Sequence, residues 1–318
     1  MRAFCISHRK DVDGLGSAAM VVAATGAEVL LSDYEDMVTN LKSIPGDTSQ
    51  VVICDLGVDN ADFDDLLIEI KRLSARAKVT YVDHHYMSPA TRKRLRAVGV
   101  HVVHDVKECS SMLVYKTFKS DLPERARLLA LCGAVTDYMD DSPMAKKMME
   151  QADRPFVLLE ASMLSFALGR KAGTAGFPEF IVAELSKMKH PHEIDGVPQA
   201  AVEQLAEEAG LGEHVKSEGK KLGRLAYMVT TQYSTGNIAK LLIGAFGAPV
   251  GVALKSKEEG WYEVSLRGTS ECRAHLGKTI AKIASQLGGS GGGHRKAAGC
   301  RVPISKADEM LKLLSKKI

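Results

Sequence analysis

The sequence predicts an α/β protein with an N-terminal doubly wound parallel sheet, a helical connector and a smaller C-terminal α/β domain with a mixed sheet. Three observations support this fold class. The 318 residues exceed the roughly 100–200 residues of a typical single domain. Apolar residues make up 45% of the chain, enough to fill two cores. In the first half, short apolar runs rich in β-branched residues alternate with helix-like segments, which is the pattern of βαβ units.

The first 120 residues contain five strand-like runs with helix-like segments between them. Each run is mostly apolar, as expected of a strand that is covered on both faces of a parallel sheet. The strand-like runs are residues 2–7, 27–32, 51–56, 78–83 and 100–105. The helix-like segments are residues 14–25, 63–78, 89–98 and 110–120. In a doubly wound sheet ligands bind beyond the carboxyl ends of the strands, so side chains there are the first candidates for a site.

Helical patterns dominate from Pro123 to Leu211, interrupted by two clusters of Gly and Pro that indicate loops. We expect the connector here and divide the chain into residues 1–150, 151–215 and 216–318. The C-terminal part predicts a mixed α/β domain in which a glycine-rich loop precedes the last strand. Its strands are predicted at 225–231, 249–256, 261–269 and 300–304, its helices at 234–247, at 275–288 and at the C-terminus, and the loop at 289–299.

Membrane association and export are not expected from the composition. No apolar run approaches the ~18 residues of a membrane span. The N-terminus leads directly into a strand-like segment rather than a signal peptide. Six cysteines are scattered without a C-x-x-C pair, so reduced and mostly buried thiols are expected. Together these features predict a cytoplasmic protein that does not bind membranes.

Charge is distributed unevenly along the chain. The net charge is +3, but residues 216–318 carry 18 Lys and Arg against 7 Asp and Glu, a net charge of +11, which leaves −8 for residues 1–215. A basic surface by itself is often only a solvated one. Beside a divalent-metal site it favours a polyanionic partner such as nucleic acid, because phosphates are attracted to both.

Acidic and imidazole side chains recur at four places where an element gives way to a loop. Hard carboxylate oxygens with a minority of imidazole nitrogens suit Mn²⁺ or Mg²⁺ better than a structural zinc ion, which usually takes cysteine thiolates. This donor set predicts a catalytic divalent-metal site. The residues are His8, Asp11 and Asp13 in the first place, Asp55 in the second, Asp83, His84 and His85 in the third, and Asp137 in the fourth.

Combined with a distant glycine motif, these residues give the chain a resemblance to a known family. The order H-x-x-D-x-D-G, D, D-H-H and D, followed by G-G-G-H and A-A-G, resembles the DHH phosphoesterase superfamily, in the subgroup with the DHH-associated C-terminal domain. This subgroup includes RecJ-type exonucleases, nanoRNases and cyclic di-AMP phosphodiesterases. The resemblance covers nearly the whole chain apart from residues 145–215. The late motifs are Gly291-Gly292-Gly293-His294 and Ala297-Ala298-Gly299.

The resemblance implies a role for each residue of the first four motifs. Two metal ions about 3.5–4 Å apart can share a water, lower its pKa and direct the resulting hydroxide at phosphorus. His85 would donate to the substrate phosphate, and Asp83 would support the histidines from behind. The implied ligands are His8, Asp11 and Asp55 for one ion and Asp13, His84 and Asp137 for the other, with Asp55 bridging both.

Neighbouring acidic and imidazole residues compete with this assignment. Asp140 and Asp141 follow Asp137 closely, but a helix-like run leads into Asp137 and the preceding Thr completes the family pattern. We therefore interpret the other two carboxylates as an acidic cluster at a helix end or loop. His190 and His192 are interpreted as residues of an exposed loop rather than as ligands.

The glycine-rich C-terminal segment is expected to bind substrate. Without Cβ atoms, its backbone N–H groups can approach an anion closely, and a histidine there can donate to a phosphate. An arginine at a strand end can clamp a phosphate with its fork-shaped guanidinium. The resemblance implies that this domain grips the nucleotide over the metal centre, so that substrate lies between the domains. The candidate residues are Arg267, Gly291, Gly292, Gly293 and His294.

The main functional hypothesis combines the metal site, the basic second domain and the resemblance. We expect a Mn²⁺-dependent phosphodiesterase or exonuclease that hydrolyses short or single-stranded RNA or DNA to nucleoside monophosphates. It would hold two Mn²⁺ ions per site, with Mg²⁺ or Co²⁺ as substitutes. Aromatic residues are only 5% of the chain, which favours a short grip on bases. Trp261, Tyr262 and Tyr233 are candidates for stacking, although each fits core or hairpin packing equally well.

Three alternatives use the same motifs. A cyclic dinucleotide phosphodiesterase and an adenosine bisphosphate phosphatase would need the same metals and the same glycine motif. A non-catalytic binding subunit of a replication or repair complex is the alternative from another class. The sequence leaves open the direction of cleavage, the choice between RNA and DNA, the physiological metal, a homodimer and a replication or repair partner.

Overall fold

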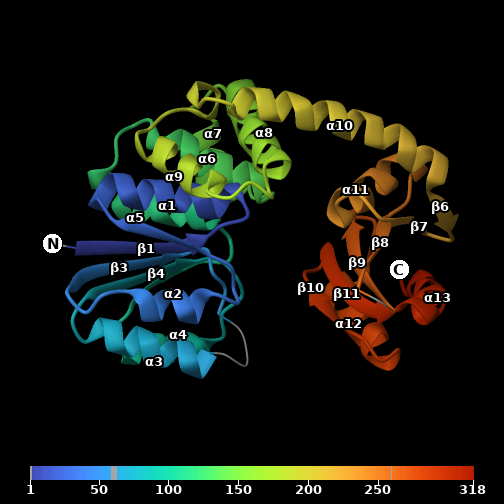
Figure 1. The fold of residues 1–318 in the computed structure, drawn as a ribbon, viewed down its shortest axis with the longest axis horizontal. Coiled ribbons are helices and arrows are strands. Elements are labelled where there is room, and N and C mark those ends of the chain that lie inside the picture. Colours follow the sequence, from blue (N-terminus) through green and yellow to red (C-terminus); the bar gives the residue numbers. More distant parts are fainter. Residues whose placement is uncertain (1, 59–62, 259) are drawn as a thin grey trace. The chain divides into compact units, whose positions relative to one another are not determined.

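The protein is described by a computed structural model, which covers residues 2–58, 63–258 and 260–318 (Figure 1). The chain forms two compact units, unit 1 from Met1 to Leu205 and unit 2 from Ala206 to Ile318. The boundary falls within one long helix, α10, which spans Val197–Glu218.

Unit 1 is built on a parallel five-stranded sheet, which confirms the predicted fold class. The strand order is β2-β1-β3-β4-β5, and each neighbouring pair is parallel. From β1 the chain extends the sheet first to one side and then to the other, so the topological switch point lies between β1 and β3. The strands are β1 (Arg2–His8), β2 (Glu28–Ser32), β3 (Thr48–Cys54), β4 (Lys78–Asp83) and β5 (His101–His104).

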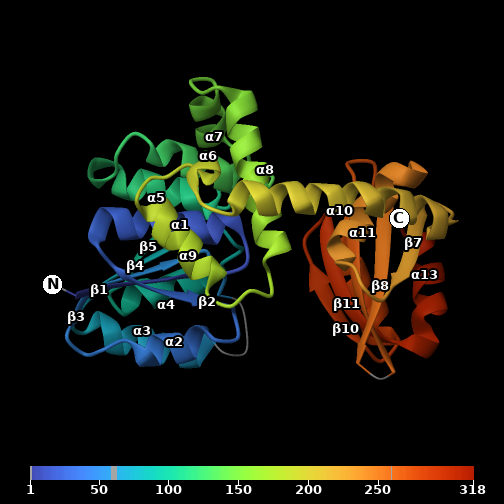
Figure 2. The same ribbon diagram turned by 45° about the horizontal axis from the view of Figure 1, so that its top comes forward.

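Helices cover both faces of this sheet, as Figures 1 and 2 show. One apolar core lies between the sheet and helices α1, α5, α6, α8 and α9, and a second lies between the sheet and helices α2, α3 and α4. The bounds are α1 (Val12–Thr25), α2 (Met37–Ser43), α3 (Phe63–Ser74), α4 (Pro89–Ala97), α5 (Ser110–Phe118), α6 (Ala126–Thr136), α7 (Pro143–Met149), α8 (Arg154–Arg170) and α9 (Phe177–Ser186), with 3₁₀ turns η1 (Lys119–Asp121) and η2 (Pro191–Glu193).

Helix α2 was not predicted, because seven residues are too few to display helical periodicity. Helices α8 and α9 fall within the predicted connector, and they pack against α6 and α1 in the core of unit 1. The division of the chain at 1–150, 151–215 and 216–318 stays a prediction.

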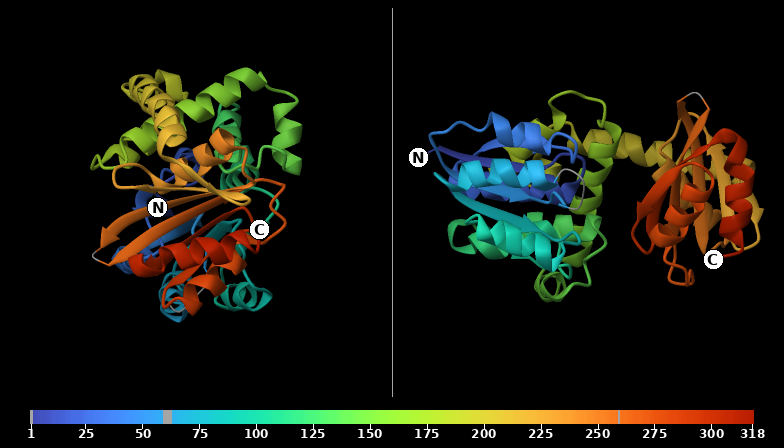
Figure 3. Two further views of the ribbon diagram at one scale, coloured as in Figure 1. Left: turned by 90° about the vertical axis from the view of Figure 1, so that its right-hand side faces the viewer. Right: turned by 90° about the horizontal axis from the view of Figure 1, so that it is seen from below.

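Unit 2 contains a mixed six-stranded sheet in the order β10-β11-β9-β8-β7-β6. Only β7 and β8 are parallel; the other pairs are antiparallel. Helix α11 packs on one face of the sheet, and helices α12 and α13 pack on the other (Figure 3). The bounds are β6 (Lys220–Leu222), β7 (Leu225–Thr230), α11 (Thr235–Phe246), β8 (Val250–Glu258), β9 (Trp261–Gly268), α12 (Leu276–Gln286), β10 (Ser290–Gly293), β11 (Ala297–Pro303), 3₁₀ turn η3 (Ile304–Lys306) and α13 (Ala307–Ser315).

The prediction of a loop at residues 289–299 was wrong for most of the segment. Residues Ser290–Gly293 form the edge strand β10, which pairs with β11 in an antiparallel register that sets Gly291 opposite Cys300. Strand β11 also begins earlier than predicted, at Ala297. Glycine has a low intrinsic preference for strands, so here the partner strand, and not the local sequence, decides the conformation.

All six cysteines are buried and unpaired, in agreement with the expectation of buried thiols. Among the helices that the structure describes, none combines the length and the apolar character needed to cross a bilayer.

Candidate metal centre

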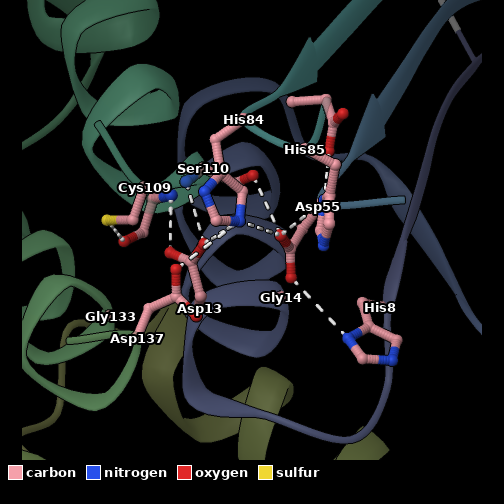
Figure 4. A network of polar contacts seen from close by, with 12 residues as sticks. His8, Asp13, Gly14, Asp55, His84, His85, Cys109, Ser110, Gly133 and Asp137 are labelled. Carbon is pink, nitrogen blue, oxygen red and sulfur yellow. Dashed lines mark hydrogen bonds and ion pairs between the residues drawn. The ribbon is translucent and has the colours of Figure 1, made fainter. Parts of the chain in front are cut away.

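Three of the predicted donor residues of unit 1 lie where three adjacent strands end. Strand β1 ends at His8, Asp55 follows the last residue of β3, and His84 follows the last residue of β4. Because these strands are parallel and hydrogen-bonded in the order β1-β3-β4, their carboxyl ends meet at one edge of the sheet. Figure 4 shows the resulting side chains pointing toward one another. The site therefore lies at the topological switch point.

The start of helix α1 brings two further carboxylates to the same edge. Asp11 is the N-cap of α1, and its Oδ1 accepts a hydrogen bond from the backbone N–H of Gly14 at 2.9 Å. Asp13 lies in the first turn of the helix. A Cβ atom at residue 14 would lie 2.3 Å from the carbonyl oxygen of His8, so this tight passage from β1 into α1 requires glycine.

One set of donors surrounds His8. Its Nδ1 lies 2.8 Å from Oδ2 of Asp11 and 3.7 Å from Oδ2 of Asp55. The donor atoms of His8, Asp11 and Asp55 all lie within 4.8 Å of one another. This spacing is short enough for three side chains to contact one cation.

A second set surrounds His84 and shares the same central carboxylate. Nε2 of His84 lies 3.5 Å from Oδ1 of Asp55, 3.5 Å from Oδ2 of Asp137 and 4.0 Å from Oδ2 of Asp13. Asp13, His84 and Asp137 form a group whose donor atoms lie within 4.8 Å of one another. Asp55 thus directs one oxygen to each set. The six predicted ligands are brought together; their role as ligands stays a proposal.

Helix α5 holds Asp13 in place through contacts that the sequence analysis missed. The backbone N–H groups of Ser110 and Ser111 donate to Oδ2 and Oδ1 of Asp13, both at 2.8 Å. The hydroxyl of Ser110 donates to Oδ1 of Asp55 at 3.0 Å. The amino end of a helix favours negative charge, so α5 stabilises the most buried part of the site. The serines that open a helix after β5 are a signal for such an end, but the sequence does not say which carboxylate it receives.

The electrostatics of the site fit divalent cations. Asp13 and Asp55 are each only 2% exposed. Burial and the nearby Asp55 carboxylate raise the pKa of Asp13 to about 7, and burial likewise raises the pKa of Asp137 to about 6. Protons therefore partly neutralise an excess of buried negative charge, which a pair of divalent ions would neutralise instead. Oxygen donors with a minority of imidazole nitrogens suit Mn²⁺ or Mg²⁺.

The same buried negative charge raises the pKa values of the two histidines of these sets. Burial alone would lower the pKa of His8, but the carboxylates of Asp11 and Asp55 outweigh it and raise that pKa to about 10. His84 shows the same balance, with its pKa raised to about 10 chiefly by Asp55 and Asp13 against the effect of burial. Burial would raise the pKa of Asp55, yet its two histidine partners keep that pKa below the ordinary value.

His85 lies beside these two sets and is held in a fixed orientation. Its Nδ1 donates to Oδ1 of the fully buried Asp83 at 2.9 Å, and its Nε2 lies 3.2 Å from the hydroxyl of Tyr34. Nε2 of His104 donates to the backbone carbonyl of His85 at 2.7 Å. Asp83 therefore contacts Nδ1 of His85 and leaves Nε2 on the other side of the ring. Its role as a support for the histidines stays a proposal.

The competing carboxylates lie outside both donor sets. Asp140 forms an ion pair of 3.7 Å with Arg154, and neither Asp140 nor Asp141 belongs to a group of metal-binding geometry in the described part of the chain. Asp137 caps the carboxyl end of α6 and belongs to the second set. The geometry thus favours Asp137 over its two neighbours.

Comparison with protein-family models identifies both units. Residues 3–138 match the model described as "DHH family, N-terminal domain", and residues 223–318 match the "DHHA1 domain". The two models together span most of the chain. The first covers the metal-binding motifs, and the second covers the glycine motif.

The chain belongs to the DHH family. Residues 3–138 form its DHH domain, and residues 223–318 form a C-terminal DHHA1 domain.

Individual relatives add information on the fold. An uncharacterized protein of Methanocaldococcus jannaschii is 36% identical over 84 residues, which span 24% of this chain and 24% of that protein. A pGpG-specific phosphodiesterase from Vibrio cholerae covers 99% of this chain and 98% of its own, with a TM-score of 0.61 and 14% identity. RecJ of Thermus thermophilus in complex with Mn²⁺ covers 99% of this chain but 51% of its own, with a TM-score of 0.62 and 16% identity. At these identities the two solved structures show a common fold.

The DHHA1 domain places the predicted substrate-binding residues at neighbouring positions. Arg267 on β9 stands opposite Ala297 on β11, and Gly293 on β10 stands opposite Ala298. The backbone N–H of Gly277, at the start of α12, donates to the carbonyl of His294 at 2.9 Å. The glycine strand and the end of β9 therefore belong to one end of the sheet. Binding of substrate by Arg267, Gly291, Gly292, Gly293 and His294 stays a proposal.

Unit 1 also contains a cavity that the sequence analysis missed. It has a volume of about 350 Å³ and is lined by residues next to His8 and by the loop between α8 and α9. Three cations line it: Arg9, Lys10 and Lys171. Arg9 pairs with Glu179 at 3.3 Å and Lys10 pairs with Asp33 at 3.0 Å.

His190 and His192 lie in a polar cluster around a buried carboxylate, and not simply on an exposed loop. Glu160 on α8 is 2% exposed, accepts from the backbone N–H of His192 at 3.1 Å and contacts the Nδ1 atom of the same residue. Nε2 of His190 accepts from Arg125 at 3.1 Å. The donor atoms of the three residues have metal-binding spacing, but His192 already satisfies both oxygens of Glu160. The cluster therefore fixes η2 to α8.

Proposed function

We propose that this DHH-family protein is a Mn²⁺-dependent phosphodiesterase that removes nucleoside monophosphates from short or single-stranded oligonucleotides. The observation that carries the proposal is the pair of donor sets that share Asp55 at the switch point of the sheet. Its two carboxylate oxygens face different histidines, which suits a bridging ligand. RecJ structures with Mn²⁺ or Mg²⁺ have the same fold, which supports the choice of metals.

The residues at the switch point would form two groups, and each group would bind one metal ion. Two divalent ions would activate water and neutralise negative charge on the phosphoryl oxygens. The N-terminus of α5 fixes both oxygens of Asp13, so this carboxylate keeps its position whatever the charge of the substrate. The proposed ligands are His8, Asp11 and Asp55 for one ion and Asp13, His84 and Asp137 for the other.

His85 supplies a donor for the substrate phosphate. Burial would lower its pKa, but the hydrogen bond and charge of Asp83 outweigh burial and raise it. Since Nδ1 is bound to Asp83, the proton that can reach a phosphoryl oxygen is the one on Nε2. Asp83 thus acts as a positioning residue, because it sets which nitrogen of His85 faces the substrate.

The basic charge of residues 216–318 supports an oligonucleotide as substrate. A net charge of +11 attracts the phosphates that do not react. In unit 1, Arg9, Lys10 and Lys171 around the cavity beside His8 would hold a further phosphate. We assign the grip on the nucleotide in the DHHA1 domain to Arg267, the three glycines of β10 and His294.

A linear dinucleotide is the second candidate substrate. The pGpG-specific phosphodiesterase of Vibrio cholerae matches the chain over nearly its whole length, whereas the chain spans about half of RecJ from Thermus thermophilus. Hydrolysis of cyclic dinucleotides and of adenosine bisphosphate stays a prediction. A homodimer, a cytoplasmic location and a replication or repair partner stay predictions as well.

One set of digestions tests the proposal. RNA and DNA ladders labelled at either the 5′ or the 3′ end, pGpG, cyclic di-AMP and adenosine 3′,5′-bisphosphate are incubated with Mn²⁺, Mg²⁺, Co²⁺ or EDTA. We expect stepwise release of mononucleotides that requires metal, with the shortest oligomers turned over fastest.

A matched pair of variants assigns the activity to the site. Asp55→Asn removes the shared charge at nearly constant shape, and Asp140→Asn makes the same change at a carboxylate outside both donor sets. We expect at least a ~10³-fold loss of kcat for the first and little change for the second. Retained hydrolysis in Asp55→Asn would refute the catalytic assignment and favour the non-catalytic binding subunit.

A further inference from the structure

The exposed tyrosines of this protein gather at the metal centre. Three tyrosines are strongly exposed: Tyr34 at 50%, Tyr86 at 68% and Tyr138 at 72%. The other five are buried or half-buried. Tyr86 directly follows His85, Tyr138 directly follows Asp137, and Tyr34 contacts His85. Exposed aromatic side chains that gather at one place on a surface are a sign of a binding site.

Tyr34 has the best-defined position of the three. Its ring centroid lies 5.3 Å from that of His8 and 6.1 Å from that of His85, with an edge-on arrangement toward His85. Its hydroxyl lies 3.2 Å from Nε2 of His85. The ring is thus fixed between one histidine of the first donor set and the histidine that faces the phosphate, while half of the residue stays open to solvent.

Tyr138 adopts a backbone conformation that a tyrosine rarely has. Its φ angle is +58°, in the left-handed region, at the position after the C-cap of α6. Glycine is the usual residue at this position because it has no Cβ penalty there. A bulky residue in this conformation is strained, and such strain is concentrated at functional sites. The turn presents an exposed aromatic ring one residue beyond a proposed metal ligand.

We propose that these tyrosines, here called the tyrosine rim, bind the nucleobases on either side of the scissile phosphate. The inference rests on the proposed function and extends it to the substrate class. Tyr34 is the main stacking surface, because its ring lies beside the histidine that would hold the phosphate. Aromatic rings stack on any base, and one stacked base strengthens binding by about five- to 150-fold.

The rim predicts a chemical preference that the metal ions cannot supply. Metal ions and His85 recognise the phosphate and would treat all phosphodiesters alike. A ring that stacks on a base distinguishes a nucleotide from a sugar phosphate without a base. The substrate class is therefore a phosphodiester that carries a base within reach of Tyr34, and one or two bases are enough.

Paired substrates and paired variants test this inference. A dinucleotide is compared with its counterpart that has an abasic sugar at one of the two positions. Tyr34→Phe and Tyr34→Leu both lose the hydrogen bond to His85, but only Tyr34→Phe keeps the ring. Phe180→Leu, at a residue of α9 that is 40% exposed, is the control for loss of an exposed aromatic ring elsewhere. The readouts are kcat and KM with Mn²⁺, and the binding of fluorescein-labelled dinucleotides in EDTA.

We expect the protein and Tyr34→Phe to favour the base-containing dinucleotide by at least about fivefold, chiefly through KM and binding. In Tyr34→Leu this preference should fall toward one, and in Phe180→Leu it should stay. Equal preferences in Tyr34→Leu and Tyr34→Phe would overturn the stacking role. If the unaltered protein hydrolyses neither dinucleotide, the proposed function fails, while the binding ratio in EDTA still decides for or against the rim.

Discussion

A methyl group at residue 133 tests whether helix α5 really positions Asp13. Gly133 lies on α6, where an added Cβ atom would be 2.1 Å from Oγ of Ser111, 2.9 Å from its Cβ and 2.7 Å from Oδ1 of Asp13. Non-bonded heavy atoms do not approach a Cβ atom this closely, so Ser111 and Asp13 must move. The N–H group of Ser111 is one of the two that hold the carboxylate of Asp13.

The expected cost of Gly133→Ala follows from three terms. Overpacking costs about 1–3 kcal/mol, and loss of a hydrogen bond to a charged group costs about 1.5–3 kcal/mol. Against these two costs, alanine stabilises a helix by about 1 kcal/mol relative to glycine. The balance is a destabilisation of about 1.5–5 kcal/mol. Each kcal/mol lowers the Tm of a domain of this size by about 2–4 °C.

Thermal unfolding and calorimetric titration with Mn²⁺ measure this effect. Gly169→Ala is the matched control, because Gly169 lies in helix α8 of the same unit. An added Cβ there would have no atom within 4 Å apart from its chain neighbours and the backbone of its own helix. We expect the control to keep its Tm or gain slightly, and Gly133→Ala to lose both stability and affinity for Mn²⁺. If Gly133→Ala unfolds like the control and binds Mn²⁺ normally, the contact between α5 and Asp13 does not support the site.

Further predictions concern metal, pH and the orientation of His85. EDTA should lower the Tm, and added Mn²⁺ should raise it, because a ligand that binds only the folded state stabilises it. Without metal, the folded state binds protons more tightly than the unfolded chain, since the pKa of Asp13 is raised to about 7 and that of Asp137 to about 6. The Tm in EDTA should therefore fall from pH 5 to pH 8, and the gain on adding Mn²⁺ should grow; the opposite slope would contradict the charge balance. Asp83→Asn should lower kcat by at least tenfold with nearly unchanged affinity for Mn²⁺ in titrations, because it disturbs only the tautomer of His85.

The sequence by itself determined the sheet of unit 1 and the edge at which the donors gather. Uninterrupted apolar runs indicate buried parallel strands, and a residue directly after such a run lies at the carboxyl edge. His8, Asp55 and His84 could be placed together on this ground alone. Asp137 needed the family resemblance as well, because it ends a helix and other carboxylates follow it closely.

Only the tertiary structure decided the contacts between elements that are distant in the chain. Asp13 is held by the amino end of α5, almost 100 residues later, and Tyr34 reaches His85 from the turn after β2. The glycine segment became a strand because β11 pairs with it, which no local preference of glycine indicates. Local periodicity follows from the covalent spacing of side chains and can be read from the chain. Pairing, capping and stacking across the fold depend on which surfaces meet, and that is fixed only when the whole core packs.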